Sequence, residues 1–201
     1  MSRRFAAVLV LAAASAFAQK LDPVQWTLAA GDGKIAPGGQ IVLTLKATLE
    51  PGWHMYSPST PPGGPIATTI TVADSPAVDQ FSVHEPKPET QRDPNFDNLE
   101  VRWFEKEVSF ALPVQIKKDA GPGEVQIAAQ VRYQACDAKQ CLPPRKKTAT
   151  AAVTIDPAAP SQVGAIPAGY LAVAKRAETT RGVNPGAQPP ANQPQAAQNA
   201  D

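Results

Sequence analysis

An alternation of apolar and polar residues at every second position constrains the fold of this chain more than any other feature. In residues 40–49, QIVLTLKATL, every odd-numbered position is apolar and most even-numbered positions are polar. Residues 107–116 and 124–135 show the same period of two. Because successive side chains of a β-strand point to opposite faces, the pattern predicts strands with one buried and one solvated face.

Weaker strands are predicted at residues 24–30, 66–72, 78–83, 99–104 and 148–155. Segments rich in glycine and proline separate the strands, among them GDGKIAPGG and PPGGP, and such segments form turns. About eight short strands with no helical pattern between them predict an all-β fold, an immunoglobulin-like antiparallel β-sandwich. A closed barrel is compatible with the same pattern.

The first 18 residues have the pattern of a secretory signal peptide. Arg3 and Arg4 precede a short apolar stretch, and Ala16-Phe17-Ala18 provides small residues for cleavage before Gln19. The apolar stretch is much shorter than the roughly 20 residues that a membrane-spanning helix needs. We therefore predict export of the mature chain to a compartment where disulfides persist.

The composition changes near residue 157 and divides the mature chain in two. Residues 19–157 contain the predicted strands, whereas residues 158–201 are rich in Pro, Ala and Gln and predict a disordered tail. Within the tail, GYLAVAKRAE at 169–178 is compatible with one short helix. The net charge of +1 indicates no nucleic-acid partner.

Cys136 and Cys141 are the only cysteines, and four residues separate them. This spacing is typical of a hairpin tip and predicts that the pair lies at the end of the sandwich. In the strand that ends at Ala135, the apolar positions are odd-numbered, so Cys136 falls on the outward-facing parity if the strand continues.

A cross-link over so short a loop stabilises a fold weakly. A loop of about six residues gives roughly 2 kcal/mol, against nearly 5 kcal/mol for a loop of about 100 residues. Arg132, Lys139 and the basic run Arg145–Lys147 lie near the pair in sequence, and positive neighbours favour the reactive thiolate. The same basic run is equally typical of a solvated strand face.

The residues alone leave three uses for the pair: redox exchange, a structural hairpin disulfide, or a metal site. A zinc site needs four ligands, and only His54 and His84 remain to complete one. Met55 beside His54 would suit copper(I), but no spacing brings these groups to the cysteines. Motifs for a serine nucleophile or a phosphate-binding loop are missing. We predict no metal and no cofactor.

Three segments together resemble the N-terminal periplasmic domain family of the thiol:disulfide interchange protein DsbD. They are VRYQACDAKQCLPP at 131–144, LEPGWHMYSPSTPPGGPIATTITV at 49–72 and DPNFDNLEVRWFEKEVSFALPV at 93–114. The most specific element is the motif Tyr-Gln-x-Cys…Cys-x-Pro-Pro. The resemblance spans residues 22–156 and independently implies an immunoglobulin-like sandwich.

The resemblance implies a periplasmic thiol:disulfide oxidoreductase that uses no cofactor. Its cysteine pair would receive electrons from a membrane-embedded DsbD-like domain and pass them to thioredoxin-fold acceptors, such as disulfide isomerases and cytochrome c maturation proteins. The chemistry is thiol–disulfide exchange through a mixed disulfide. By the family pattern, Cys141 attacks the acceptor and Cys136 resolves the mixed disulfide.

The resemblance also implies the residues around the pair. Phe96 matches an aromatic residue on a cap loop that shields the disulfide, and Asp93 matches an acidic neighbour. His54 and Tyr56 match an aromatic pair beside the site, and Tyr133 belongs to the cysteine motif. The alternatives are an ordinary loop aromatic at Phe96 and an ordinary strand start at His54 and Tyr56.

This chain departs from the family pattern in three ways. The best-known member has one more residue between its cysteines and an aromatic residue where this chain has His54. Neither a membrane domain nor a thioredoxin domain follows, so we expect either a free-standing relay with a separately encoded donor or a fragment. The alternative function is a non-catalytic exported binding module with a structural hairpin disulfide.

Overall fold

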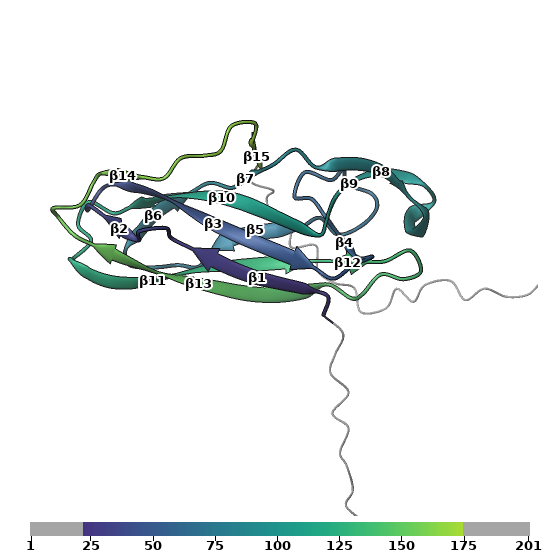
Figure 1. Ribbon diagram of the computed structural model, residues 1–201, viewed down its shortest axis with the longest axis horizontal. Helices are drawn as coiled ribbons and strands as arrows, with labels where there is room; N and C mark the ends of the chain where they lie inside the picture. The colour runs from purple at the N-terminus through teal and green to yellow at the C-terminus, as the bar shows by residue number, and fades with distance from the viewer. Residues whose placement is uncertain (1–21, 175–201) are drawn as a thin grey trace, which may run out of the picture.

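The computed structural model describes residues 22–174, which form a β-sandwich with a small additional sheet at one end (Figure 1). The predicted signal peptide and residues 175–201 of the predicted tail lie outside this range. Across the described range, no helix is long and apolar enough to cross a membrane.

Three sheets make up the fold. The first has the order β1-β3-β10-β7-β15, with β14 on β3 and β6 on β10. Its strands are β1 (Val24–Ala29), β3 (Gln40–Leu49), β6 (Val78–Phe81), β7 (His84–Glu85), β10 (Glu107–Ile116), β14 (Gln162–Val163) and β15 (Leu171–Ala172). The second has the order β2-β13-β11-β5. Its strands are β2 (Lys34–Ile35), β5 (Thr69–Val72), β11 (Gly123–Tyr133) and β13 (Arg145–Ile155).

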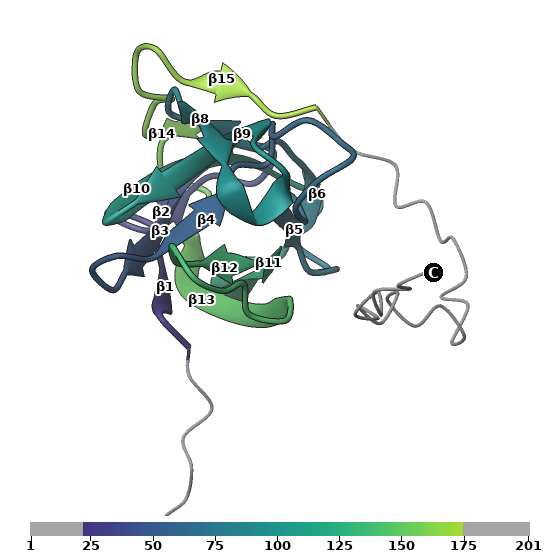
Figure 2. The same cartoon turned by 90° about the vertical axis from the view of Figure 1, so that its right-hand side faces the viewer.

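The first two sheets pack face to face, as Figures 1 and 2 show, and the predicted alternation forms the core between them. On β3 the odd-numbered residues from Ile41 to Leu49 are buried, and on β11 the odd-numbered residues from Ile127 to Tyr133 are buried. The prediction of an all-β, immunoglobulin-like sandwich is confirmed. Most pairings are antiparallel, but the short pairs β2–β13 and β14–β3 are parallel.

The third sheet lies at one end of the sandwich, on the right in Figure 1 and facing the viewer in Figure 2. It has the order β12-β4-β9-β8. Its strands are β4 (His54–Tyr56), β8 (Glu89–Asp93), β9 (Leu99–Glu105) and β12 (Ala135–Cys136), and the short 3-10 helix η1 (Pro94–Phe96) follows β8. The chain therefore passes from the second sheet into the third between Tyr133 and Ala135.

The expectation that Cys136 faces outward is wrong. Cys136 is fully buried, and so is its neighbour Ala135. The parity argument required one continuous strand, but β11 ends at Tyr133 and β12 pairs with β4 instead of with β13. The break at Gln134 resets which face each following side chain occupies.

The short helix expected over residues 169–178 does not form in its described half. Leu171–Ala172 is the strand β15, which pairs with β7. Tyr170 N donates to Pro167 O in a turn, and Gly169 has a left-handed φ of +81° that helical residues do not adopt. Because β14 and β15 pair within the first sheet, the chain remains on the sandwich beyond residue 158, where the sequence places the start of the tail. Residues 175–178 lie outside the described range.

Asp22 ties the start of the described chain to the second sheet. Its Oδ1 accepts a hydrogen bond of 2.7 Å from the Tyr133 hydroxyl, and Lys147 Nζ lies 2.6 Å from its Oδ2. Arg145 is 3.7 Å from the same oxygen. Burial raises the pKa of the Asp22 carboxyl, but the bonds from Lys147 and Tyr133 and the two cations outweigh burial and lower the pKa below its usual value.

Asp22→Asn is expected to lower the free energy of unfolding at pH 7 by about 1–3 kcal/mol, because it removes charged hydrogen bonds. A carboxyl whose folded pKa is lowered stabilises the fold above its unfolded pKa and loses this contribution as pH falls through the folded value. The difference between wild type and variant should therefore be smaller near pH 3 than at pH 7 in urea unfolding. Lys46→Gln breaks the exposed Lys46–Glu107 pair and should cost less than about 1 kcal/mol. An equal loss at both pH values would contradict this account of Asp22.

Candidate functional site

Cys136 and Cys141 form a disulfide that closes a tight hairpin. Asp137 N donates to Gln140 O (2.9 Å), and Leu142 N donates to Ala135 O (2.9 Å). The Asp137 carboxylate accepts from the backbone N–H groups of the next turn, and these bonds lower its pKa. The disulfide lies at the end of the sandwich, as its spacing predicted.

The two cysteines differ in exposure. Cys136 is fully buried in a small cluster with Tyr56 and Val101, whereas Cys141 is only partly buried and packs against that cluster from outside. A reaction partner in solution can therefore approach the Cys141 side of the disulfide more readily than the Cys136 side.

The hydroxyl of Tyr56 lies directly against the disulfide. Its oxygen is 3.2 Å from Cys136 Sγ and 4.0 Å from Cys141 Sγ. The hydroxyl donates a short hydrogen bond to Oδ2 of Asp93, whose side chain is also fully buried. Burial raises the pKa of Tyr56, and the bond to Asp93 raises it further, so the phenol stays protonated at neutral pH.

The local structure explains why a buried carboxylate is tolerated at residue 93. Asp93 ends β8 and caps η1, where its Oδ1 accepts from Asn95 N at 2.9 Å. Its Oδ2 faces both Tyr56 and His54. Burial of a charge is costly unless hydrogen bonds satisfy it, and here both oxygens of the carboxylate have partners.

His54 completes this polar cluster. It is the backbone partner of Cys136 in the pairing of β4 with β12. Its Nε2 lies 3.3 Å from the Tyr56 hydroxyl oxygen and 3.6 Å from Asp93 Oδ2, and its ring packs against Trp103 at a tilt of 40° with centroids 3.9 Å apart. Burial lowers the pKa of His54, and the negative charges of Asp93 and Asp137 oppose this effect only in part.

Phe96 lies over the same cluster. Its ring meets the Tyr56 ring edge-on at 5.9 Å, and it packs against the cluster together with Cys141. Asn95 Nδ2 donates to Asp137 O at 3.2 Å, which ties the loop of Phe96 to the cysteine hairpin.

Gly64 lies close to Leu99 and to the Phe96 ring. A Cβ at this position would lie 2.5 Å from Leu99 Cδ2 and 3.9 Å from Phe96 Cδ1, so a side chain at residue 64 would displace Leu99.

The structure thus brings Cys136, Cys141, Tyr56, Asp93, His54 and Phe96 together, but it places Tyr133 elsewhere. Tyr133 packs on Trp26 in the main core at a centroid distance of 5.4 Å, and its hydroxyl binds Asp22. Asp22 also pairs with Arg145 and Lys147, which the sequence placed near the cysteines. Both cations therefore hold the start of the described chain against the second sheet.

Sequence reasoning missed Trp103 and Asn95, and it gave Gln134 only as a member of the cysteine motif. Trp103 lies opposite Tyr56 in the β4–β9 register, and its place in an alternating segment signalled only a strand. The Gln134 side chain accepts from Ile66 N at 3.0 Å and donates to Leu142 O at 3.3 Å. It therefore joins the loop around Gly64 to the segment that follows Cys141.

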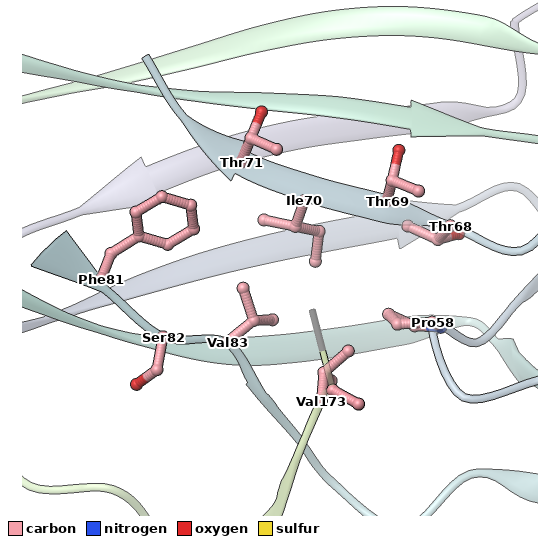
Figure 3. Close-up of a pocket in the computed structure, with 10 residues that line it drawn as sticks. Pro58, Thr68, Thr69, Ile70, Thr71, Phe81, Ser82, Val83 and Val173 are labelled. Carbon is pink, nitrogen blue, oxygen red and sulfur yellow. The ribbon is translucent and has the colours of Figure 1, made fainter. Parts of the chain in front are cut away.

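A cavity of about 280 Å³ lies apart from these residues (Figure 3). Ile70 of β5 and Val83 point into it, Phe81 lies at one end and Pro58 at the other. None of the predicted site residues lines it. Among residues 22–174, no three His, Cys, Asp or Glu side chains are grouped as metal ligands, and the predicted lack of a metal remains a prediction.

The family to which this chain belongs follows from a comparison with known protein families. The family described as thiol:disulfide interchange protein DsbD, N-terminal, matches residues 25–152, well over half of the chain. The chain belongs to this family. No curated protein matches it.

Solved structures that are similar to this chain include two domains of related proteins. The N-terminal periplasmic domain of ScsB from Proteus mirabilis has 20% sequence identity and a TM-score of 0.47, over 70% of this chain and 49% of that one. The match therefore spans about half the length of the ScsB chain. The reduced DsbD N-terminal domain of Neisseria meningitidis has 16% identity and a TM-score of 0.39, over 67% of this chain and 89% of that one.

Phe96→Ala should expose the cysteine pair, because the Phe96 ring packs against the cluster of Tyr56, Val101 and Cys136. After reduction, the variant is expected to be oxidised by a small disulfide such as oxidised glutathione several-fold faster than wild type. Thiol loss followed with a chromogenic reagent measures the rate. Phe81→Ala, far from the cysteines, is the matched control. An unchanged rate for Phe96→Ala would show that Phe96 does not shield the pair.

Proposed function

We propose that this protein is a periplasmic thiol:disulfide oxidoreductase that relays electrons through Cys136 and Cys141. A membrane-embedded DsbD-like domain would reduce the pair, and thioredoxin-fold proteins would oxidise it. The observation that carries the proposal is the unequal burial of a disulfide whose two sulfurs both face the Tyr56 hydroxyl. Membership of the DsbD N-terminal family supports the same chemistry.

Thiol–disulfide exchange would transfer two electrons to the acceptor in two steps. The Cys141 thiolate attacks one sulfur of the acceptor's disulfide, that bond breaks, and the acceptor's other sulfur leaves as a thiolate. The Cys136 thiol then loses its proton and attacks Cys141 Sγ, which releases the acceptor's second thiolate. Two electrons pass to the acceptor, whose two sulfurs take up the two protons that the cysteines lost.

Burial supports this division of roles. The attacking sulfur must reach a partner's disulfide, and Cys141 is the partly exposed member of the pair. The resolving sulfur needs only to reach Cys141, and Cys136 is fully buried beside it. Tyr56 and Asp93 are the polar groups beside the buried Cys136 sulfur. They can accept or supply a proton, and the Tyr56 hydroxyl can stabilise a negative charge on this sulfur.

A structural disulfide is the second candidate function. The bond joins a hairpin that already has backbone hydrogen bonds, and Cys136 is part of the small hydrophobic cluster below the cap. The reduction potential separates the two functions. We expect a value near or above about −230 mV, whereas a value below about −300 mV would indicate a structural bond.

Cys136→Ala is expected to trap mixed disulfides with thioredoxin-fold proteins through Cys141, because the resolving thiol is removed. Affinity purification from periplasmic extract under non-reducing conditions measures the trapped species. Cys141→Ala is the matched control and should trap far less, since Cys136 is fully buried. Equal trapping by both variants would overturn the assigned roles, and no trapping by either would overturn the relay.

A further inference from the structure

Two groups compete for one oxygen of the buried Asp93 carboxylate. The Tyr56 hydroxyl donates to Oδ2, and His54 Nε2 lies 3.6 Å from the same oxygen. A tyrosine hydroxyl has a single proton, so the hydroxyl cannot donate to Asp93 and to a sulfur at the same time. A carboxylate is a stronger acceptor than a disulfide sulfur, so in the disulfide form the hydroxyl donates to Asp93, and Cys136 Sγ is the alternative acceptor.

The hydrogen bond from the Tyr56 hydroxyl to Asp93 determines which ring nitrogen of His54 carries the proton. The Tyr56 oxygen has used its proton on Asp93, and a carboxylate only accepts. His54 Nε2, which lies 3.3 Å from the Tyr56 oxygen, therefore has a partner there only if it carries the proton itself. In this arrangement, Nε2–H points toward Tyr56 and Asp93 together.

Opening the disulfide changes the demand on Tyr56. During resolution, Cys136 becomes a thiolate, and a buried anion without a hydrogen-bond donor is costly. The Tyr56 hydroxyl lies 3.2 Å from Cys136 Sγ and can turn its proton toward the sulfur. Asp93 would then lose a donor on Oδ2 and keep the bond from Asn95 N on Oδ1.

We propose that His54 is a positioning residue that takes over the Asp93 carboxylate when the Tyr56 hydroxyl turns to the Cys136 thiolate. The imidazole N–H replaces the phenol as the donor to Oδ2, so neither the carboxylate nor the thiolate is left without a partner. This inference rests on the proposed exchange function and adds the way in which the buried sulfur is made reactive.

The charged groups around His54 are compatible with this role. Asp93 at the end of β8 and Asp137 after β12 both act on the imidazole, and Trp103 of β9 covers its ring. Glu105, its backbone partner on β9, has an exposed side chain. Tyr56 lies beside the imidazole, and Cys136 is the backbone partner of His54 on β12. Because burial lowers the pKa of His54, the imidazole at neutral pH is neutral and has one N–H to donate.

The test measures the pKa of the Cys136 thiol in full-length protein that carries Cys141→Ala, so that Cys136 is the only thiol. The ultraviolet absorbance of the thiolate is followed against pH. His54→Phe removes the donor and is expected to raise the thiol pKa by about one unit, a tenfold loss of thiolate at a given pH. His54→Gln keeps an N–H donor and is expected to remain close to the parent.

A double-variant cycle with Tyr56→Phe decides whether His54 acts through Tyr56. Tyr56→Phe alone should raise the thiol pKa, and adding His54→Phe should then change it little, because residues that act through one another are not additive. A full additional shift in that background, or no shift from His54→Phe alone, would overturn the proposal. If His54→Phe does not fold, His54→Met provides the variant without a donor.

His84→Phe is the matched control, because His84 is a half-buried histidine that contacts Ser82 away from the disulfide. A shift as large as that of His54→Phe would also overturn the proposal. The thiol titration needs no partner protein, whereas the relay is tested by trapping with Cys136→Ala. A failure of His54 to act and a failure of the relay are therefore seen in different experiments.

Discussion

The departure of the chain from the second sheet at Gln134 is the constraint on which the site depends. Up to Tyr133, β11 belongs to the sandwich and pairs with β13, and from Ala135 the chain pairs with β4 in the third sheet. The Gln134 side chain fixes this transition by binding Ile66 N and Leu142 O. If β11 continued without a break, Cys136 would face solvent and could not meet Tyr56.

This change of sheet creates two sulfur environments from one short hairpin. Cys136 is placed beside a buried phenol and a buried carboxylate, while Cys141 is only partly buried and packs against the same cluster. The same disulfide therefore contributes to packing and remains open to attack from one side. A hairpin cross-link adds only about 2 kcal/mol through chain entropy. The main core lies between the two large sheets, so the fold remains stable when the disulfide is broken during exchange.

Much of the architecture was predictable because it depends on local alternation. The segments at 40–49, 107–116 and 124–133 are strands in the structure, and their apolar faces form the core. The resemblance to the DsbD family also named Phe96, Asp93, His54 and Tyr56, which the structure gathers around the disulfide. It named Tyr133 as well, but this residue serves the main core, because membership of a motif does not determine where a side chain points.

Periodicity and spacing within short segments are sufficient to predict the strands, the sandwich class and the hairpin that holds the cysteine pair. The burial of Cys136, the ion pairs of Asp22 with Arg145 and Lys147, and the carboxylate that His54 shares with Tyr56 follow from the packing of the three sheets. Each of these contacts joins residues far apart in the chain or depends on a break in a strand. No local pattern encodes such contacts, because they arise from the way in which sheets pack and from the register between their strands.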